Sequence, residues 1–150
     1  GWTYACDTIM DTYYGAAVNI QGATSTLAQK AVMPAFRDDS FIQTYMKKYD
    51  NRRRYAYDLF NSIPGVSMQM PEAGFFVWID VSQLGDSSEI TDLLTKDALV
   101  SANDGKFYGD MGNGHLRLID GCFWKDEDSY AAMDRMAATF RKLAKKKGLC

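Results

Sequence analysis

The run Gly114-His115-Leu116-Arg117-Leu118-Ile119-Asp120 decides how the rest of this chain is interpreted. It predicts a strand with one buried face, because alternation places its two leucines on one side and Arg117 on the other. Arginine keeps its charge in proteins, so a partly buried Arg117 needs an anion. Its planar fork suits a carboxylate held by two parallel hydrogen bonds. That carboxylate is either internal, from Asp80 or Asp120, or belongs to a bound substrate.

The composition is that of an ordinary globular domain. Hydrophobic residues make up 47% of the 150 residues, charged residues make up 24%, and the formal net charge is −2. This balance has no basic excess, so neither nucleic acid nor an anionic membrane is expected as a partner. No stretch is long and apolar enough to span a membrane. Because no initiator Met precedes Gly1, we expect the chain to be a piece of a longer protein.

The cysteines argue against a metal centre. Cys6, Cys122 and Cys150 are widely spaced, and the chain contains no CxxC pair. With a single histidine, His115, no zinc site is expected. Free thiols of this kind predict a reducing, cytoplasmic compartment.

Residues 1–36 predict only short elements of secondary structure. Residues 1–22 are rich in Tyr, Gly and Ala without a helical period, which predicts the end of a strand, a short helix and a loop. Thr24 or Ser25 caps a second short helix that runs to about Phe36. Pro34 falls late in this helix, so we expect it to be kinked or to end early.

The longest predicted helix runs from about Phe41 to Ser62. Its apolar residues recur with a period near 3.6 and form one face, made of Phe41, Tyr45, Tyr49, Ala56, Leu59, Phe60 and Ile63. Pro64-Gly65 then stops the helix. The triplet Arg52-Arg53-Arg54 in its middle predicts a solvated face, although one of the three arginines could reach a partner.

From residue 66 onward, the pattern changes to strands mixed with helices. Strands are expected at about residues 66–70, 75–81, 99–102 and 115–119. Ser87 caps a helix that ends near Ala98, and Asp126 caps the final helix. The order ββαββα predicts an α+β fold, a small and mostly antiparallel sheet with helices on one face. The strands at 75–81 and 115–119 should share this sheet.

Two blocks of the second half resemble a known family. Pro71–Asp80 resembles the proline–glycine–aromatic entry into a strand in the small domain of class I/II aminotransferases, which are fold-type-I enzymes that use pyridoxal phosphate. Gly114–Leu118 is similar to their glycine–x–x–arginine motif, whose arginine binds the substrate α-carboxylate. Between the two blocks, Leu99–Ala102 and Gly105–Gly109 are similar to the segment that precedes this motif.

Two upstream segments extend the resemblance over essentially the whole chain. Gly1-Trp2 is similar to the start of the glycine–tryptophan–arginine element just past the catalytic lysine, and Thr24–Gln29 resembles a loop and helix start of the family. Thr3 stands where the family has an arginine that contacts the cofactor phosphate. The Schiff-base lysine would precede Gly1. The resemblance therefore implies pyridoxal 5'-phosphate in the parent enzyme, and an isolated chain that is inactive.

The resemblance also implies a domain organisation. The chain would be the C-terminal portion of an aminotransferase, with the small α+β domain of an α/β superfamily member. Residues 1–36 would be the end of the large cofactor-binding domain, 37–63 a long bridging helix, and 64–150 the small C-terminal domain. The parent enzyme would transfer an amino group between an amino acid and a 2-oxo acid.

The resemblance further implies a set of site residues. Arg117 would anchor the substrate carboxylate, and Gly74 and Phe75 would lie on the small-domain edge that closes over the substrate. Phe107 would seal the mouth of the site against water. From the residues alone, Gly74 and Phe75 form a plain β-turn equally well, Phe107 is an ordinary core aromatic, and His115 is structural.

Other functions and partners stay open from the sequence. Lyases and synthases of the same fold, such as β-lyases and aminocyclopropane-carboxylate-synthase-like enzymes, share these motifs. A non-catalytic carboxylate-binding or assembly module would keep the small-domain fold. Apolar side chains such as Trp2, Tyr13 and Leu27 are too many for a short N-terminal segment to cover. We therefore expect a missing N-terminal portion or a homodimer to bury them.

Overall fold

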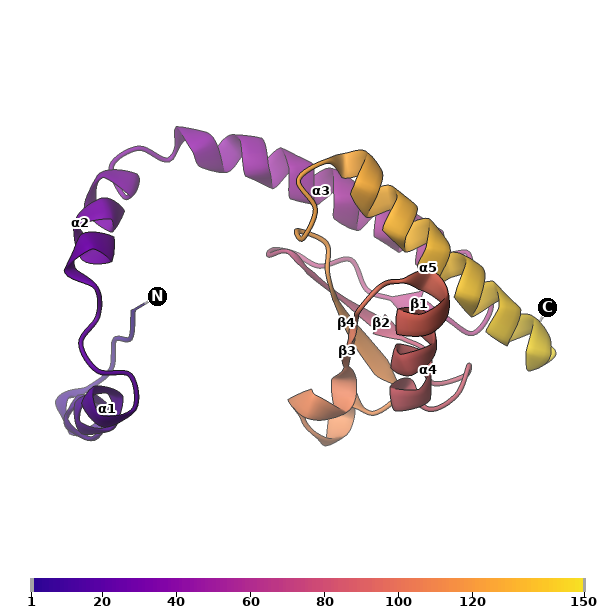
Figure 1. The fold of residues 1–150 in the computed structure, drawn as a ribbon, viewed down its shortest axis with the longest axis horizontal. Coiled ribbons are helices and arrows are strands. Elements are labelled where there is room, and N and C mark those ends of the chain that lie inside the picture. The colour runs from indigo at the N-terminus through magenta and orange to yellow at the C-terminus, as the bar shows by residue number, and fades with distance from the viewer. Residues whose placement is uncertain (1, 150) are drawn as a thin grey trace. The chain divides into compact units, whose positions relative to one another are not determined.

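A computed structural model describes residues 2–149 of the chain (Figure 1). The chain divides into two compact units, and the boundary along the sequence lies between Ile42 and Gln43. Within residues 2–149, no helix combines the length and the apolar character that a membrane crossing needs.

The first unit consists of two helices, α1 (Asp7–Ile20) and α2 (Thr26–Ala35). Helix α1 has 14 residues, so the predicted short helix was too short. None of its residues is buried. The apolar residues Ile9, Tyr13 and Ala17 nevertheless recur four residues apart, a helical period that the prediction of a short helix overlooked. Helix α2 begins as predicted, because the Ser25 hydroxyl accepts a hydrogen bond from the Ala28 N–H at 3.4 Å.

The second unit is built on the long helix α3 (Ser40–Asn61), close to its predicted bounds. Its buried residues are Arg52, Ala56 and Phe60, which lie four residues apart and therefore on one face. Helix α5 (Asp126–Lys146) runs beside α3, and the two helices are joined by an edge-to-face contact of Phe60 with Phe140 at 5.7 Å (Figure 1).

The sheet of the second unit has four antiparallel strands in the order β1-β2-β4-β3. They are β1 (Ser67–Met68), β2 (Phe76–Asp80), β3 (Asn103–Asp104) and β4 (His115–Ile119). Strands β2 and β4 are central neighbours, with Trp78 opposite Arg117. The predicted α+β fold, with both motif strands in one antiparallel sheet, is therefore confirmed.

The two faces of the sheet differ in burial. Val77 and Ile79 of β2, together with Leu116 and Leu118 of β4, point into the core that the helices cover. The alternate side chains lie on the other face and stay partly exposed: Phe76, Trp78, Asp80, His115 and Arg117. The alternation thus separates a packed face from a face that can receive a ligand.

The segment between β2 and β3 departs from its predicted boundaries. The side chain of Asp86, not Ser87, caps α4 (Ser87–Leu93) by accepting from two backbone N–H groups. The helix continues as a π-helical turn to Ala98 and ends at Leu99, whose φ of 54° is left-handed. A left-handed residue cannot begin a strand, so the strand predicted at 99–102 starts instead at Asn103.

Arg52 reaches partners, the alternative that the sequence left open for one of the three arginines, and it does not lie on the predicted solvated face. This residue is 0% exposed, and its Nε pairs with Asp126 Oδ1 at 2.8 Å. Its Nη1 and Nη2 donate to the carbonyls of Asp120 and Phe123 at 2.8 and 2.9 Å. Asp126 therefore pairs with Arg52 at the start of α5 and does not cap the helix as predicted. Arg54 is solvated, as the triplet pattern predicted.

Asp120 is a buried carboxylate beside this cluster. It is 1% exposed, and neither side-chain oxygen has a hydrogen-bond partner. Burial raises the pKa of Asp120 to about 6, although the charges of Arg52 and Arg53 oppose the rise. The carboxylate is therefore destabilising when it is ionised.

Replacing Arg52 should test how strongly its hydrogen bonds hold the second unit. Arg52→Met leaves two carbonyls and the Asp126 carboxylate without their donor, so we expect a loss of about 3 kcal/mol in the free energy of unfolding. Arg54→Met removes an exposed i,i+4 pair with Asp50 and should cost less than about 0.5 kcal/mol. Urea unfolding measures both changes. Equal losses in the two variants would show that the buried hydrogen bonds of Arg52 stabilise the second unit no more than an exposed ion pair does.

Asp120 should make the stability depend on pH. Its folded pKa lies above the unfolded value of 3.8, so the folded state binds more protons in the window between these values. Stability should therefore fall as pH rises from about 4 to about 6, by up to about 3 kcal/mol from this group. Asp120→Asn should remove this loss, whereas Asp58→Asn, at an exposed site on α3, should keep it. The free energy of unfolding is measured at pH 4.5 and at pH 7. If it changes between these pH values by the same amount in the wild type and in Asp120→Asn, the assignment is refuted.

Candidate functional site

Arg117 lies between two aromatic rings on the open face of the sheet. Its guanidinium carbon is 3.5 Å from the centroid of the Phe76 ring and 5.0 Å from that of Tyr108. Its Nη1 donates a hydrogen bond to the Tyr108 hydroxyl at 2.7 Å. These contacts hold the plane of the guanidinium by cation–π attraction and one directed hydrogen bond.

Arg117 has no carboxylate partner within residues 2–149. The predicted internal salt bridge to Asp80 or Asp120 is wrong, and the strand geometry explains why. Asp120 points to the buried side of the sheet, and Asp80 lies opposite His115, two residues along β4 from Arg117. The Nε and Nη2 groups of Arg117 therefore have no partner in the described part of the chain, and they retain the capacity to bind an external anion.

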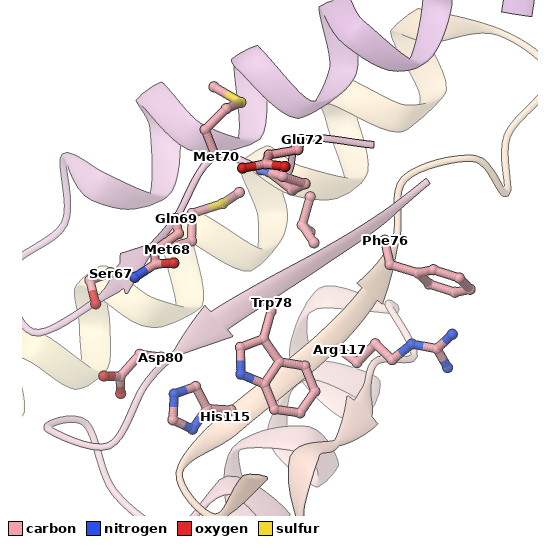
Figure 2. A pocket seen from close by; sticks show the side chains of 12 residues that line it. Ser67, Met68, Gln69, Met70, Glu72, Phe76, Trp78, Asp80, His115 and Arg117 are labelled. Atoms are coloured by element: carbon pink, nitrogen blue, oxygen red, sulfur yellow. The ribbon is translucent and has the colours of Figure 1, made fainter. Parts of the chain in front are cut away.

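A cleft of about 600 Å³ opens beside Arg117 (Figure 2). It lies between β2 and the segment 67–72, and Figure 2 shows Arg117 and Asp80 toward opposite ends of it. Its lining consists of Ser67, Met68, Gln69, Met70, Pro71, Glu72, Phe76, Val77, Trp78, Asp80, His115 and Arg117. A lining of apolar side chains with a few polar groups among them is typical of a site for a small organic molecule.

The far end of the cleft is a polar cluster around Asp80. Trp78 and His115 stack with ring centroids 5.4 Å apart, and His115 Nδ1 lies 3.1 Å from the Asn113 carbonyl. Burial opposes the charge of Asp80, but hydrogen bonding by Ser82 and electrostatic attraction by the nearby His115 outweigh it and lower the pKa of Asp80. This end therefore carries a stable negative charge, opposite in sign to the Arg117 end.

Among the sequence-predicted residues, only Arg117 lines the cleft. Gly74 is exposed, with a φ of 82° that favours glycine, and Phe75 is 42% exposed beside Tyr49 and Phe76. Phe107 is 82% exposed and lies outside the cleft, so the prediction of an ordinary core aromatic is wrong. The closing and sealing roles of these three residues stay predictions.

Tyr108 is the site residue that the sequence reasoning missed. Its hydroxyl accepts hydrogen bonds from Arg117 Nη1 and from Asn103 Nδ2, both at 2.7 Å. Its ring meets Trp78 edge-on, with centroids 5.8 Å apart. The hydrogen bond from Asn103, followed by that from Arg117, lowers the pKa of Tyr108. No spacing rule marks this position, because Tyr108 reaches the strand from the end of a short 3-10 helix (Gly105–Tyr108) in the connection between β3 and β4.

The loop that carries Tyr108 is tied firmly to α4. Asp104 is buried and accepts hydrogen bonds from the hydroxyls of Ser87 and Ser88, at 2.7 and 2.5 Å. The loop also packs backbone on backbone, since a Cβ added at Gly105 would lie 2.2 Å from the Gly112 carbonyl oxygen. Only glycine fits at such a distance, so the loop has one tightly defined path.

The charges of the cleft fit a carboxylate better than a phosphate. Its lining contains one guanidinium, two carboxylates, Glu72 and Asp80, and no lysine. A single fork with two unpaired donor groups matches one carboxylate. In the described part of the chain, no group of three or more His, Cys, Asp or Glu side chains is placed to hold a metal ion.

Comparison with known proteins agrees with this geometry. Residues 1–119 match the family model of aminotransferase class I and II. The chain is 30% identical over 118 residues to an aspartate aminotransferase of Musicola paradisiaca, covering 77% of the chain and 29% of that protein. It is 34% identical over 80 residues to a cystathionine beta-lyase of Bacillus subtilis, covering 53% of the chain and 20% of that protein.

A solved structure shows the same fold. The aromatic aminotransferase from Pyrococcus horikoshii OT3 superposes with a TM-score of 0.77 at 23% identity, over 97% of this chain and 38% of that one. The chain thus spans well under half the length of the relatives that it matches. The family model covers most of the chain, and this chain therefore belongs to the class I and II aminotransferase family.

Proposed function

We propose that this chain is the C-terminal part of a pyridoxal-phosphate-dependent aminotransferase, which transfers an amino group between an amino acid and a 2-oxo acid. Membership of the family supports the activity. The observation that carries the proposal for this chain is the unpaired fork of Arg117, held between Phe76 and Tyr108 at the edge of a cleft. Its role is to anchor the carboxylate of the amino acid and of the 2-oxo acid.

The anchor works by orientation. Because Nη1 donates to Tyr108, the side of the guanidinium formed by Nε and Nη2 offers two parallel N–H groups to one carboxylate. The Phe76 ring covers one face of the guanidinium and keeps water from it, which strengthens the charge-assisted hydrogen bonds. A substrate held at two points keeps its reacting carbon in one place, and this is the contribution to rate that the chain can make.

The described residues do not themselves fit the cofactor. The cleft has no lysine to bond pyridoxal phosphate and no second guanidinium for its phosphate. Lys106, the lysine in the loop beside Arg117, is paired with Asp86 at 2.6 Å. When bound in the whole protein, the cofactor supplies the electron sink of the reaction. The role of this chain is to bind and orient the substrate.

The domain organisation of the whole protein is part of the proposal. Residues 1–36 end the large domain, 37–63 form the bridging helix and 64–150 form the small domain. Large apolar side chains in the first unit support this organisation, because Trp2, Tyr14 and Leu27 are each at least 70% exposed. Such a surface is typical of an interface. The preceding part of the protein or a second copy in a homodimer covers it.

A lyase of the same fold is the second candidate, because the chain also resembles a cystathionine beta-lyase. Both reactions use a substrate carboxylate, so the Arg117 site serves either one. The products separate the two functions. An aminotransferase passes the amino group to an added 2-oxo acid, whereas a β-lyase releases ammonia without an acceptor.

Arg117→Lys in the full-length protein tests the proposed role directly. Lysine keeps the charge but loses the fork, so kcat/KM for amino acid and 2-oxo acid should fall together, by about 2–4 kcal/mol in transition-state stabilisation. The cofactor absorbance should hardly change, because Arg117 faces the substrate. Arg141→Lys, at an exposed position on α5, is the matched control and should leave the kinetics unaltered. An Arg117→Lys variant that melts early but turns over normally would show that Arg117 is only structural.

A further inference from the structure

Tyr108 makes a contact with Arg117 that a phenylalanine in its place could not make. The hydroxyl oxygen accepts from Arg117 Nη1 and from Asn103 Nδ2, each at 2.7 Å. Two donors occupy the acceptor positions of one phenol oxygen, so the side chain has little freedom to rotate away. The Trp78 ring meets the Tyr108 ring edge-on at 5.8 Å, and Tyr108 stays 46% exposed. Tyr108 is therefore locked before any ligand binds.

The contacts that hold Tyr108 continue to strand β3 and helix α4 of the second unit. Asn103 belongs to β3, which pairs directly with β4 opposite Arg117. Lys106, two residues before Tyr108, donates to Asp86 at 2.6 Å and to Ser88 at 3.1 Å. Helix α4 and strand β3 thus hold the tyrosine, and the tyrosine holds the guanidinium. The chain of contacts runs from rigid elements to the fork.

We propose that Tyr108 is a positioning residue, which fixes the orientation of the Arg117 fork and, when its hydroxyl ionises, competes with the substrate carboxylate for the guanidinium. This inference rests on the proposed carboxylate-anchoring function of Arg117. The neutral hydroxyl accepts one hydrogen bond from Arg117 and leaves the positive charge of the guanidinium available. The phenolate would form an ion pair with the same group and reduce its attraction for a second anion.

The two hydrogen-bond donors at this hydroxyl, Arg117 and Asn103, favour its ionisation. Arg117 is the cation that touches it, and both hydrogen bonds to its oxygen lower the pKa of Tyr108. The other facing groups, Asn103 and Trp78, carry no charge. In the same loop, Lys106 and Asp104 are satisfied by contacts with α4. Carboxylate binding should therefore weaken at alkaline pH because the Tyr108 hydroxyl ionises.

Equilibrium binding to the full-length protein tests the proposal. Pyruvate, 2-oxoglutarate and phenylpyruvate are titrated by calorimetry without an amino donor, and the tightest binder is used for all variants. At pH 7, Tyr108→Phe should raise the Kd about 5- to 10-fold, because the fork loses its directed hydrogen bond. As the pH rises and the Tyr108 hydroxyl ionises, the wild-type Kd should increase while that of Tyr108→Phe stays flat, so the ratio between them shrinks. Tyr57→Phe on α3, outside the cleft, should match the wild type throughout.

The outcomes separate this proposal from the proposed function. If Arg117→Lys binds the probe as tightly as wild type, the anchoring function fails. If Arg117→Lys weakens binding but Tyr108→Phe changes the Kd less than about twofold at pH 7, only the positioning role fails. A Kd ratio that stays constant with pH would overturn the competition, because a merely structural tyrosine affects binding equally at every pH.

Discussion

The buried guanidinium of Arg52 is the interaction on which the rest of the second unit depends. It joins the middle of α3 to two carbonyls of the β4–α5 connection and to the carboxylate that opens α5. The same connection is fixed to the start of β2, since the Asp120 N–H donates to the Phe75 carbonyl at 3.0 Å. One side chain therefore sets where β4 ends and where α5 begins. Pairing with β2 and β3 then places Arg117 between Trp78 and Asn103 in the sheet.

Two arginines of the same domain illustrate opposite uses of one chemical group. All three guanidinium nitrogens of Arg52 bond to protein oxygens, which is what a fully buried cation requires. Arg117 bonds through one nitrogen only, and aromatic rings replace further partners. A partly exposed cation tolerates this arrangement because water solvates the unpaired nitrogens. A carboxylate ligand can displace that water, so the incomplete pairing is what makes Arg117 suited to binding.

The spacing of apolar residues predicted more of this structure than the polar residues did, because the partners of the polar residues could not be predicted. Alternation in residues 115–119 placed Arg117 on the open face correctly, and the prediction that residues 75–81 and 115–119 share one sheet is confirmed. The roles of Arg52 and Tyr108 could not be predicted from the sequence. The partners of Arg52 lie 68 to 74 residues away along the chain, and a short 3-10 helix (Gly105–Tyr108) brings the Tyr108 hydroxyl to Arg117. The left-handed Leu99 also escaped prediction, since leucine rarely adopts this conformation and nothing local marks it.

The most direct measurement is a crystal structure of the full-length protein with a bound 2-oxo acid or amino acid. The central claim is that Arg117 receives the substrate carboxylate. We predict the two carboxylate oxygens within about 3 Å of Nε and Nη2, with Nη1 still bonded to Tyr108 and with Phe76 still beneath the guanidinium. A ligand whose carboxylate is bound by another cation, with Arg117 turned to solvent or paired with a protein carboxylate, would contradict the claim.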